Sequence, residues 1–149
     1  MTHSIQHVNV MVDDLATATE FYGGLLGFVP DPTPDLGFPA QFFGVGGGQQ
    51  IHVNELDDQH AERAHFCVRL DDFSSVFRRA YDAGVVEVRT WGKVRRLPTG
   101  VMQAFVRDPS GNLIELSCEA DQVVDPSIFD LDIVDGETRF FNAADTNPT

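Results

Sequence analysis

The sequence is poor in basic residues, in cysteine and in long apolar runs. Ten Lys and Arg stand against 23 Asp and Glu, which gives a net charge of −13. Such a chain lacks the positive surface that phosphate backbones require, so we expect no nucleic acid partner.

Two cysteines are too few for the disulfide framework of a small secreted protein. No apolar run approaches the roughly 18 residues of a membrane helix. Nor does the N-terminus carry a basic segment followed by an apolar one, as a signal peptide does. We therefore expect a soluble, cytoplasmic protein with no membrane partner.

An internal repeat is present instead. The sequence HVNVMVDDL begins at His7 and a similar sequence, HFCVRLDDF, begins 58 positions later at His65. A helical pattern follows each copy, with Asp13 or Asp14, and Asp71 or Asp72, as the expected N-caps. Extended segments come next, separated by turn residues. In the first half they cover about 28–31, 40–45 and 49–55; in the second they cover about 85–91, 101–107 and 112–118.

Each half therefore predicts a βαβββ module, at about 5–56 and about 63–118. A unit of this size is too small to close a core alone. We expect an α+β fold in which the two modules pair into one curved mixed sheet, forming a single domain over residues 1–118.

Residues 119–149 form an acidic C-terminal extension with eight acidic residues and one basic residue, Arg139. The extension also contains many apolar residues, so its composition does not favour disorder. Asp135-Gly136 is a hairpin signal between two alternating stretches. We expect the extension to dock, either across the mouth of the sheet or onto a second subunit.

Four strands carry a potential metal ligand on their polar face. Side chains alternate along a strand, and this alternation places His7, His52, His65 and Glu115 opposite the apolar faces. Imidazoles and a carboxylate on rigid strands suit Fe, Ni, Zn, Mn or Co, and the residues do not distinguish among these cations. A bound cation would polarise a substrate oxygen.

Three segments resemble the vicinal oxygen chelate superfamily, which includes glyoxalases, extradiol dioxygenases, and fosfomycin- and bleomycin-resistance proteins. They are the His-x-x-Val-x-aliphatic-Asp-Asp-Leu start, the FYGGLLGF sequence that follows it, and DPSGNLIEL, which begins at Asp108. The resemblance implies metal ligands on the first and last strands of each module, at His7, His52, His65 and Glu115. His52 departs from the pattern, because glyoxalase-like members usually carry Glu there. The resemblance also implies a homodimer and a glyoxalase-like fold.

The resemblance implies a metal-dependent, glyoxalase-like isomerase or lyase that binds a small molecule through vicinal oxygens. His7, His65 and Glu115 would hold the cation, and His52 would be a fourth ligand or an acid/base. We assign catalytic roles to His52 and Glu115.

Two further residues are candidates for substrate binding. Arg95 would contact an anionic group of the substrate, unless it is simply solvated in a loop. Phe105 stands where fosfomycin enzymes carry a catalytic Tyr, which argues against that activity.

Two other functions stay open. One is an Fe(II) extradiol-type dioxygenase, for which two histidines and a carboxylate are suitable ligands. The other is a metal-free, drug-binding resistance protein, since an acidic surface suits a cationic ligand.

Overall fold

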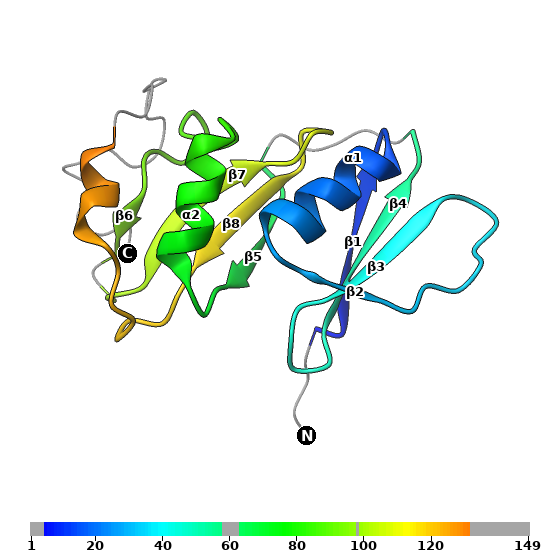
Figure 1. Cartoon of the computed structure of the whole chain (residues 1–149), viewed down its shortest axis with the longest axis horizontal. Helices are drawn as coiled ribbons and strands as arrows, with labels where there is room; N and C mark the ends of the chain where they lie inside the picture. Colours follow the sequence, from blue (N-terminus) through cyan, green and yellow to red (C-terminus); the bar gives the residue numbers. More distant parts are fainter. Residues whose placement is uncertain (1–4, 58–62, 98, 132–149) are drawn as a thin grey trace. The chain divides into compact units, whose positions relative to one another are not determined.

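The computed structural model describes residues 5–57, 63–97 and 99–131, which form two compact units (Figure 1). The first unit runs to Ala64 and includes the Asp108–Asn112 turn; the second comprises His65–Arg107 and the chain from Leu113 onward. Each unit holds one four-stranded mixed sheet, so the predicted α+β class with two modules is confirmed. Within the described ranges no helix is long and apolar enough to cross a membrane.

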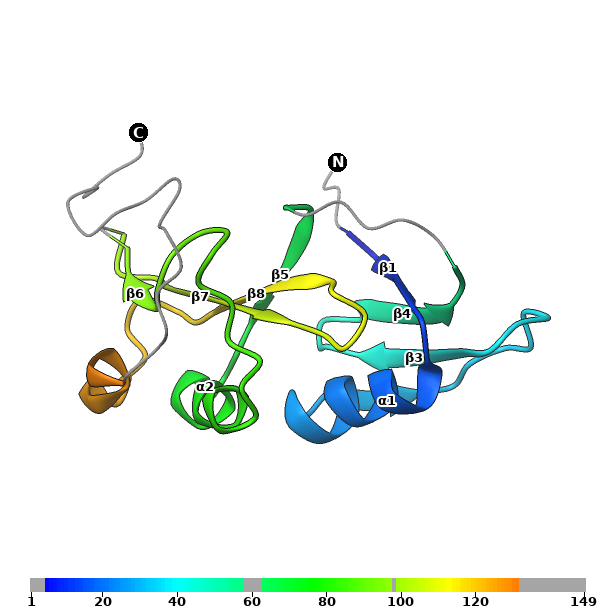
Figure 2. The ribbon, with the colours of Figure 1, turned by 90° about the horizontal axis from the view of Figure 1, so that it is seen from above.

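The sheet of the first unit has the strand order β1-β4-β3-β2, with β1 parallel to β4 and the other neighbours antiparallel. Figure 2 shows α1 on one face of this sheet. The elements are β1 (His7–Val12), α1 (Leu15–Thr19), the π-helix η1 (Glu20–Leu25), β2 (Val29–Asp31), β3 (Ala40–Gly44) and β4 (Gln50–Glu55).

The sheet of the second unit repeats this topology in the order β5-β8-β7-β6, again with a parallel pair of first and last strands. In Figure 2, α2 covers one face of it. The elements are β5 (His65–Arg69), α2 (Phe73–Asp82), β6 (Arg95–Arg96), β7 (Met102–Arg107), β8 (Leu113–Ser117) and the 3-10 helix η2 (Pro126–Asp130). The two copies of the internal sequence repeat therefore fold with the same sheet topology.

Aspartate caps begin both α-helices, as predicted. The carboxylate of Asp14 accepts a hydrogen bond from the Thr17 N–H, and Asp72 accepts one from the Ser75 N–H. The first helix does not continue as an α-helix to its end, because η1 is wound as a π-helix that closes with a bond from Leu26 N to Phe21 O. This wider winding accompanies the burial of both Phe21 and Tyr22.

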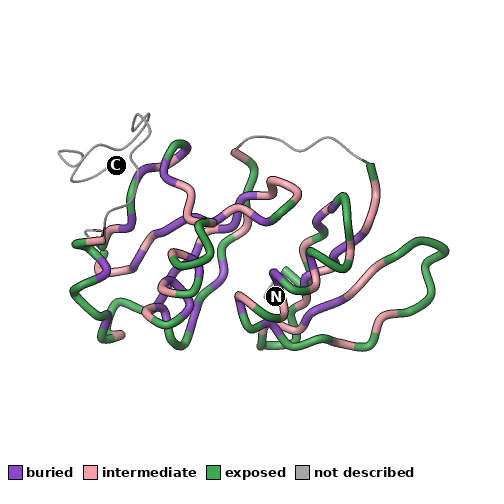
Figure 3. The backbone as a smooth tube through the Cα atoms, turned by 45° about the horizontal axis from the view of Figure 1, so that its top comes forward, coloured by how far each residue is buried: buried purple, intermediate pink, exposed green. Residues whose placement is uncertain are grey.

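The core of each unit contains the apolar faces of its strands, and Figure 3 shows where the chain is buried. In the first unit Val10, Val12, Ile51 and Val53 are buried. The corresponding buried side chains of the second unit are Val68, Ile114, Leu116 and Cys118, which pack with Phe73, Val76, Phe77 and Ala80 of α2 to form its apolar core. The opposite face of the second sheet is also largely buried, because Leu113 and Ser117 on either side of Glu115 are 2% and 6% exposed.

The strand expected at 85–91 is formed only at its start, where the Glu87 N–H donates to the Phe105 carbonyl and the Arg107 N–H donates to the Val85 carbonyl; the rest of the prediction is wrong. Only Val86 forms an isolated bridge, to Val106, and the edge strand of the second sheet is instead Arg95–Arg96. The chain turns away because the Glu87 carboxylate accepts hydrogen bonds from the Arg89 N–H and from Arg107 Nε. These bonds favour a turn at residues 89–91 over continued pairing.

The turn between β7 and β8 belongs to the first unit. The Tyr22 hydroxyl donates a 2.9 Å hydrogen bond to Asp108 Oδ2, and Asn112 Nδ2 donates a 2.7 Å bond to the Met11 carbonyl. The Asp13 N–H donates to Ser110 Oγ at 2.8 Å. The DPSGN sequence is therefore more than a turn, because it completes the first unit.

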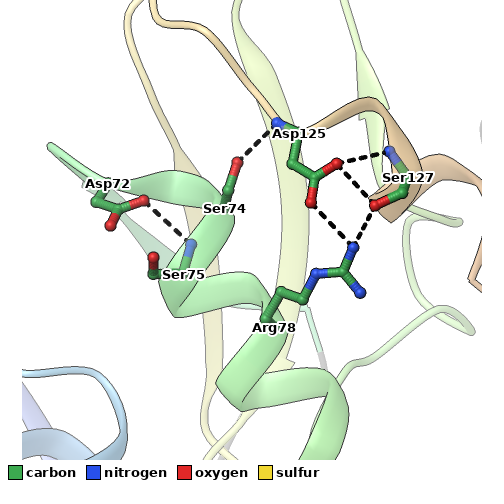
Figure 4. A network of polar contacts seen from close by, with 6 residues as sticks. All are labelled: Asp72, Ser74, Ser75, Arg78, Asp125 and Ser127. Atoms are coloured by element: carbon green, nitrogen blue, oxygen red, sulfur yellow. Dashed lines mark hydrogen bonds and ion pairs between the residues drawn. The ribbon is translucent and has the colours of Figure 1, made fainter.

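The described part of the C-terminal extension, 119–131, packs on α2 within the second unit (Figure 4). Arg78 Nη2 forms a 3.1 Å ion pair with Asp125 and a hydrogen bond with Ser127, and Ser74 Oγ accepts from the Asp125 N–H at 2.9 Å. Ile128 is fully buried. The hairpin predicted at Asp135-Gly136 lies outside the described residues, and docking onto a sheet mouth or a second subunit stays a prediction.

Candidate metal centre

In the first unit two candidate ligands, His7 and His52, lie face to face on neighbouring strands. Their rings are 4.1 Å apart between centroids and within 6° of parallel. Phe42 stacks on the other face of the His52 ring at 3.5 Å and 1°. The adjacent strands β1, β4 and β3 supply these three rings, so the sheet itself holds His52 between two aromatic surfaces.

The environment of His52 favours the neutral form of its imidazole. Burial lowers the pKa of His52, and the positive charge that His7 can carry lowers this pKa further. His52 Nε2 lies 3.1 Å from Gln50 Oε1, and His7 Nδ1 contacts Gln6 Oε1. A neutral imidazole is the form that binds a metal ion.

In the second unit the other two candidate ligands, His65 and Glu115, are in direct contact. His65 Nε2 lies 3.2 Å from Glu115 Oε2, and their side chains are 27% and 17% exposed. Phe105 meets the His65 ring edge-on at a centroid distance of 5.4 Å, and Trp91 lies 6.0 Å away from the same ring. Gln103 Nε2 donates to the second oxygen, Glu115 Oε1, at 3.2 Å.

The separation of His65 and Glu115 fits two ligands of one cation. Imidazole and carboxylate ligands bind divalent transition metals at about 2.0–2.2 Å, so two ligand atoms at octahedral or tetrahedral angles lie about 2.8–3.6 Å apart. The 3.2 Å between His65 Nε2 and Glu115 Oε2 falls within this interval. The pair could therefore accept a cation with little movement.

The two pairs occupy equivalent strand positions. His52 lies opposite Asn9 and Phe42 in the first sheet, and Glu115 lies opposite Cys67 and Phe105 in the second. Among the residues that the structure describes, no group of three or more ligating side chains that could hold a metal is gathered. Each unit contributes two candidates, and the convergence of all four stays a prediction.

The two residues predicted to bind substrate are both placed near Glu115 in the second unit. Arg95 Nε and Nη2 donate to Gln103 Oε1 at 3.1 and 2.7 Å. Phe105 is 2% exposed and packs on His65 and Trp91. Their predicted roles in binding substrate stay predictions.

Cys67 lies beside Glu115 in the sheet register. Burial and the negative charge of Glu115 raise the pKa of the Cys67 thiol to about 11. With no cation bound, Cys67 therefore carries its thiol proton at neutral pH.

Sequence analysis missed Gln50 and Gln103, the two amides that contact candidate ligands. Each lies two residues from a residue already singled out, Gln50 from His52 and Gln103 from Phe105. The alternation of strand faces could have identified both.

The chain matches known proteins over most of its length. The model of the Glyoxalase/Bleomycin resistance protein/Dioxygenase superfamily matches residues 4–116. A Vibrio cholerae protein named as a probable lactoylglutathione lyase is 28% identical over 125 residues, which cover 76% of this chain and 89% of that protein.

Solved structures show the same fold. A glyoxalase family protein of Bacillus anthracis superposes with a TM-score of 0.65 at 25% identity, covering 80% of this chain and 97% of that one. A lactoylglutathione lyase of Agrobacterium tumefaciens gives a TM-score of 0.60 at 22% identity, with 80% and 96% covered. The chain belongs to the Glyoxalase/Bleomycin resistance protein/Dioxygenase superfamily.

Proposed function

We propose that the protein is a metal-dependent, glyoxalase-like isomerase or lyase that acts on a small molecule with two neighbouring oxygens. The observation that carries the proposal is the 3.2 Å separation of His65 Nε2 and Glu115 Oε2. The stacked His7 and His52 support it from equivalent strands of the other unit.

The donor set fits a divalent transition metal, since neutral imidazoles and a carboxylate are its usual ligands. When bound, such a cation would polarise the substrate oxygens and favour loss of a proton from the adjacent carbon. His7, His65 and Glu115 would hold the cation, and His52 would complete the set or transfer protons.

The side chains themselves would move the proton. Glu115 and the neutral His52 are the two groups able to accept a proton from the substrate carbon. An isomerase returns this proton to the neighbouring carbon, so no external oxidant or reductant is needed. Arg95 and Phe105 would line the substrate, with Arg95 favouring an anionic group.

The proposal is tested by titrating the full, chelator-treated chain with Ni, Zn, Mn, Co and Fe(II) salts. A cation at 100 times its Kd should stabilise the fold by about 2.7 kcal/mol, which for a chain of this length raises Tm by about 5–11 °C. Elemental analysis should give one cation per site. Absence of any shift with every cation would refute metal dependence.

Variants identify the ligands. His7→Ala, His65→Ala and Glu115→Gln should each weaken metal binding by at least tenfold. Glu119→Gln is the matched control, because the side chain of Glu119 is 62% exposed and pairs with Arg69. Equal Kd values for Glu115→Gln and Glu119→Gln would remove Glu115 from the site.

Reaction assays separate the alternatives. Lactoylglutathione is the first compound to test for lyase activity, because a relative bears that name. Fe-dependent oxygen uptake with an aromatic diol, and no lyase activity, would instead favour the dioxygenase. Tight binding of a cationic drug by the metal-free chain, without any response to cations, would favour a resistance protein.

The proposal includes a homodimer, as the family resemblance implies. Light scattering should give twice the 16.4 kDa chain mass. A monomer that retains full activity would refute the dimeric assignment.

A further inference from the structure

We propose that Gln50 and Gln103 are positioning residues, each of which connects a candidate ligand to a charged side chain. The inference rests on the proposed metal-dependent function, which it deepens by adding a layer of residues behind the ligands. It concerns each unit separately.

In the second unit the orientation of the Gln103 amide is fixed by Arg95. A guanidinium has only donors, and two of its N–H groups contact Gln103 Oε1, at 3.1 and 2.7 Å. The Gln103 NH2 group must therefore face the other way, where it donates to Glu115 Oε1 at 3.2 Å. This bond occupies one carboxylate oxygen and leaves Oε2 directed at His65.

In the first unit the orientation of the Gln50 amide is fixed by a group of opposite charge. The Asp31 carboxylate accepts from Gln50 Nε2 at 2.5 Å. Gln50 Oε1 is then the atom near His52 Nε2, at 3.1 Å, so that nitrogen carries the proton and donates. The lone pair of a neutral His52 consequently lies on Nδ1, which is the nitrogen left to bind a cation or accept a proton.

In each unit the charged residue that contacts the amide strengthens the hydrogen bond between that amide and the candidate ligand. An anion behind Gln50 makes the amide oxygen a stronger acceptor for the N–H of His52, which raises the basicity of the opposite nitrogen. A cation behind Gln103 makes its NH2 a stronger donor to Glu115, which holds the carboxylate in place. The two amides lie on strands that are not equivalent, Gln50 on β4 and Gln103 on β7, yet each connects a candidate ligand to a charged residue of the edge strand of its sheet, Asp31 on β2 or Arg95 on β6.

The assignment gives Arg95 a different role from contact with substrate. If Arg95 acts through Gln103, its removal weakens metal binding even when no substrate is present. If Arg95 only contacts substrate, its removal raises KM and leaves the metal Kd unchanged.

The test is the Kd of Ni(II) or Zn(II), measured by calorimetry on the metal-free full chain. Gln50→Met and Gln103→Met keep side-chain length but lose the amide, and each should weaken binding by about 10–100-fold. Gln49→Met and Arg96→Met are matched neighbours: Gln49 donates to the Ile5 carbonyl, and Arg96 to the Gly100 and Ala120 carbonyls. These two variants should leave Kd within twofold of the wild type.

Double variants test the connection itself. Arg95→Met should weaken binding in the wild-type chain and have no further effect in Gln103→Met; Asp31→Asn should behave the same way with Gln50→Met. Additive effects would overturn the connection. If a methionine variant fails to fold, the single variants Arg95→Met and Asp31→Asn still test the inference. Each removes the charged partner of a glutamine amide and leaves the glutamine and the candidate ligand in place.

A second readout needs no metal. Nitrogen NMR of the metal-free chain should place the proton of neutral His52 on Nε2, and Gln50→Met should reduce the population of this tautomer. A wild-type chain that binds none of the cations would overturn the proposed function together with this inference. Wild-type binding with unchanged Kd in both glutamine variants would overturn this inference alone.

Discussion

Replacing Tyr22 by Phe removes one hydrogen bond from the interior of the first unit and keeps the ring. Tyr22 is completely buried, and its hydroxyl donates to Asp108, whose exposure is only 4%. Asp108 keeps three further donors: the N–H groups of Ser110 and Asn112, and Asn112 Nδ2. The carboxylate is therefore not left without partners in the variant.

The expected loss in the free energy of unfolding follows from the type of hydrogen bond that Tyr22→Phe removes. A hydrogen bond to a charged acceptor contributes about 1.5–3 kcal/mol net. For a chain of this size each kcal/mol corresponds to about 2–4 °C, so Tyr22→Phe should lower Tm by about 3–12 °C. Chemical denaturation should show the same loss with an unchanged m-value.

A double-mutant cycle isolates the bond. Asp108→Asn keeps the shape of Asp108 but places an amide NH2 near the Tyr22 hydroxyl. If the hydroxyl and the carboxylate interact as described, the two substitutions together should cost at least about 1 kcal/mol less than the sum of their separate effects. A loss below about 0.5 kcal/mol for Tyr22→Phe, or additive effects, would refute the reasoning.

The same bond predicts a response to alkaline pH. Burial, followed by the charge of Asp108, raises the pKa of Tyr22 well above its usual value of 10.0. The folded state then retains a proton that the unfolded state releases, so the contribution of Tyr22 is complete below pH 10 and declines above it. The stability difference between the wild type and Tyr22→Phe should therefore shrink as pH rises from 9 to 11.

Three further predictions concern the second unit. At pH 8 the Cys67 thiol should react with iodoacetamide about 100-fold more slowly than an ordinary thiol, because its pKa is raised from 9.0 to about 11. Glu115→Gln should accelerate this reaction. A rate like that of free cysteine would contradict the raised pKa of Cys67. Hydrogen bonds from Ser127, followed by Arg78, lower the pKa of Asp125 to about 2. The stabilisation by Asp125 is present above pH 4 and is lost toward pH 2, so Asp125→Asn should differ from the wild type at pH 6 and converge with it in acid. Gln122→Ala should cost about 1–3 kcal/mol in urea denaturation, because its amide bonds the Leu70 and Asp71 carbonyls and the Phe73 N–H.

Local patterns predicted most of the fold. The repeat at His7 and His65 predicted two modules, and alternation predicted the buried faces of the strands, because these features depend on neighbours along the chain. Most of the segment 85–91 was predicted wrongly, since Glu87 is engaged by Arg107, a residue 20 positions away. The winding of η1 as a π-helix was likewise not predicted.

For the candidate site, the sequence placed the four candidate ligands on the polar faces of strands, but it did not identify the side chains that contact them. His7 and His52, and His65 and Glu115, meet in pairs because strand pairing places them together. The partners of Gln103 could not be predicted, because Arg95 was expected in a loop and lies on β6. Side-chain contacts across a sheet depend on register, which the sequence alone does not specify at a short edge strand.

The membership of Asp108–Asn112 in the first unit has a consequence for how the chain can be divided. A fragment that ends at Ala64 would leave the Tyr22 hydroxyl and the Met11 carbonyl without the partners supplied by Asp108 and Asn112. Although the gene encodes two similar halves, expressing the first half alone should give a poorly folded product. Coexpression with the rest of the chain should restore folding of the first half, since the rest of the chain contains the Asp108–Asn112 turn that completes the first unit.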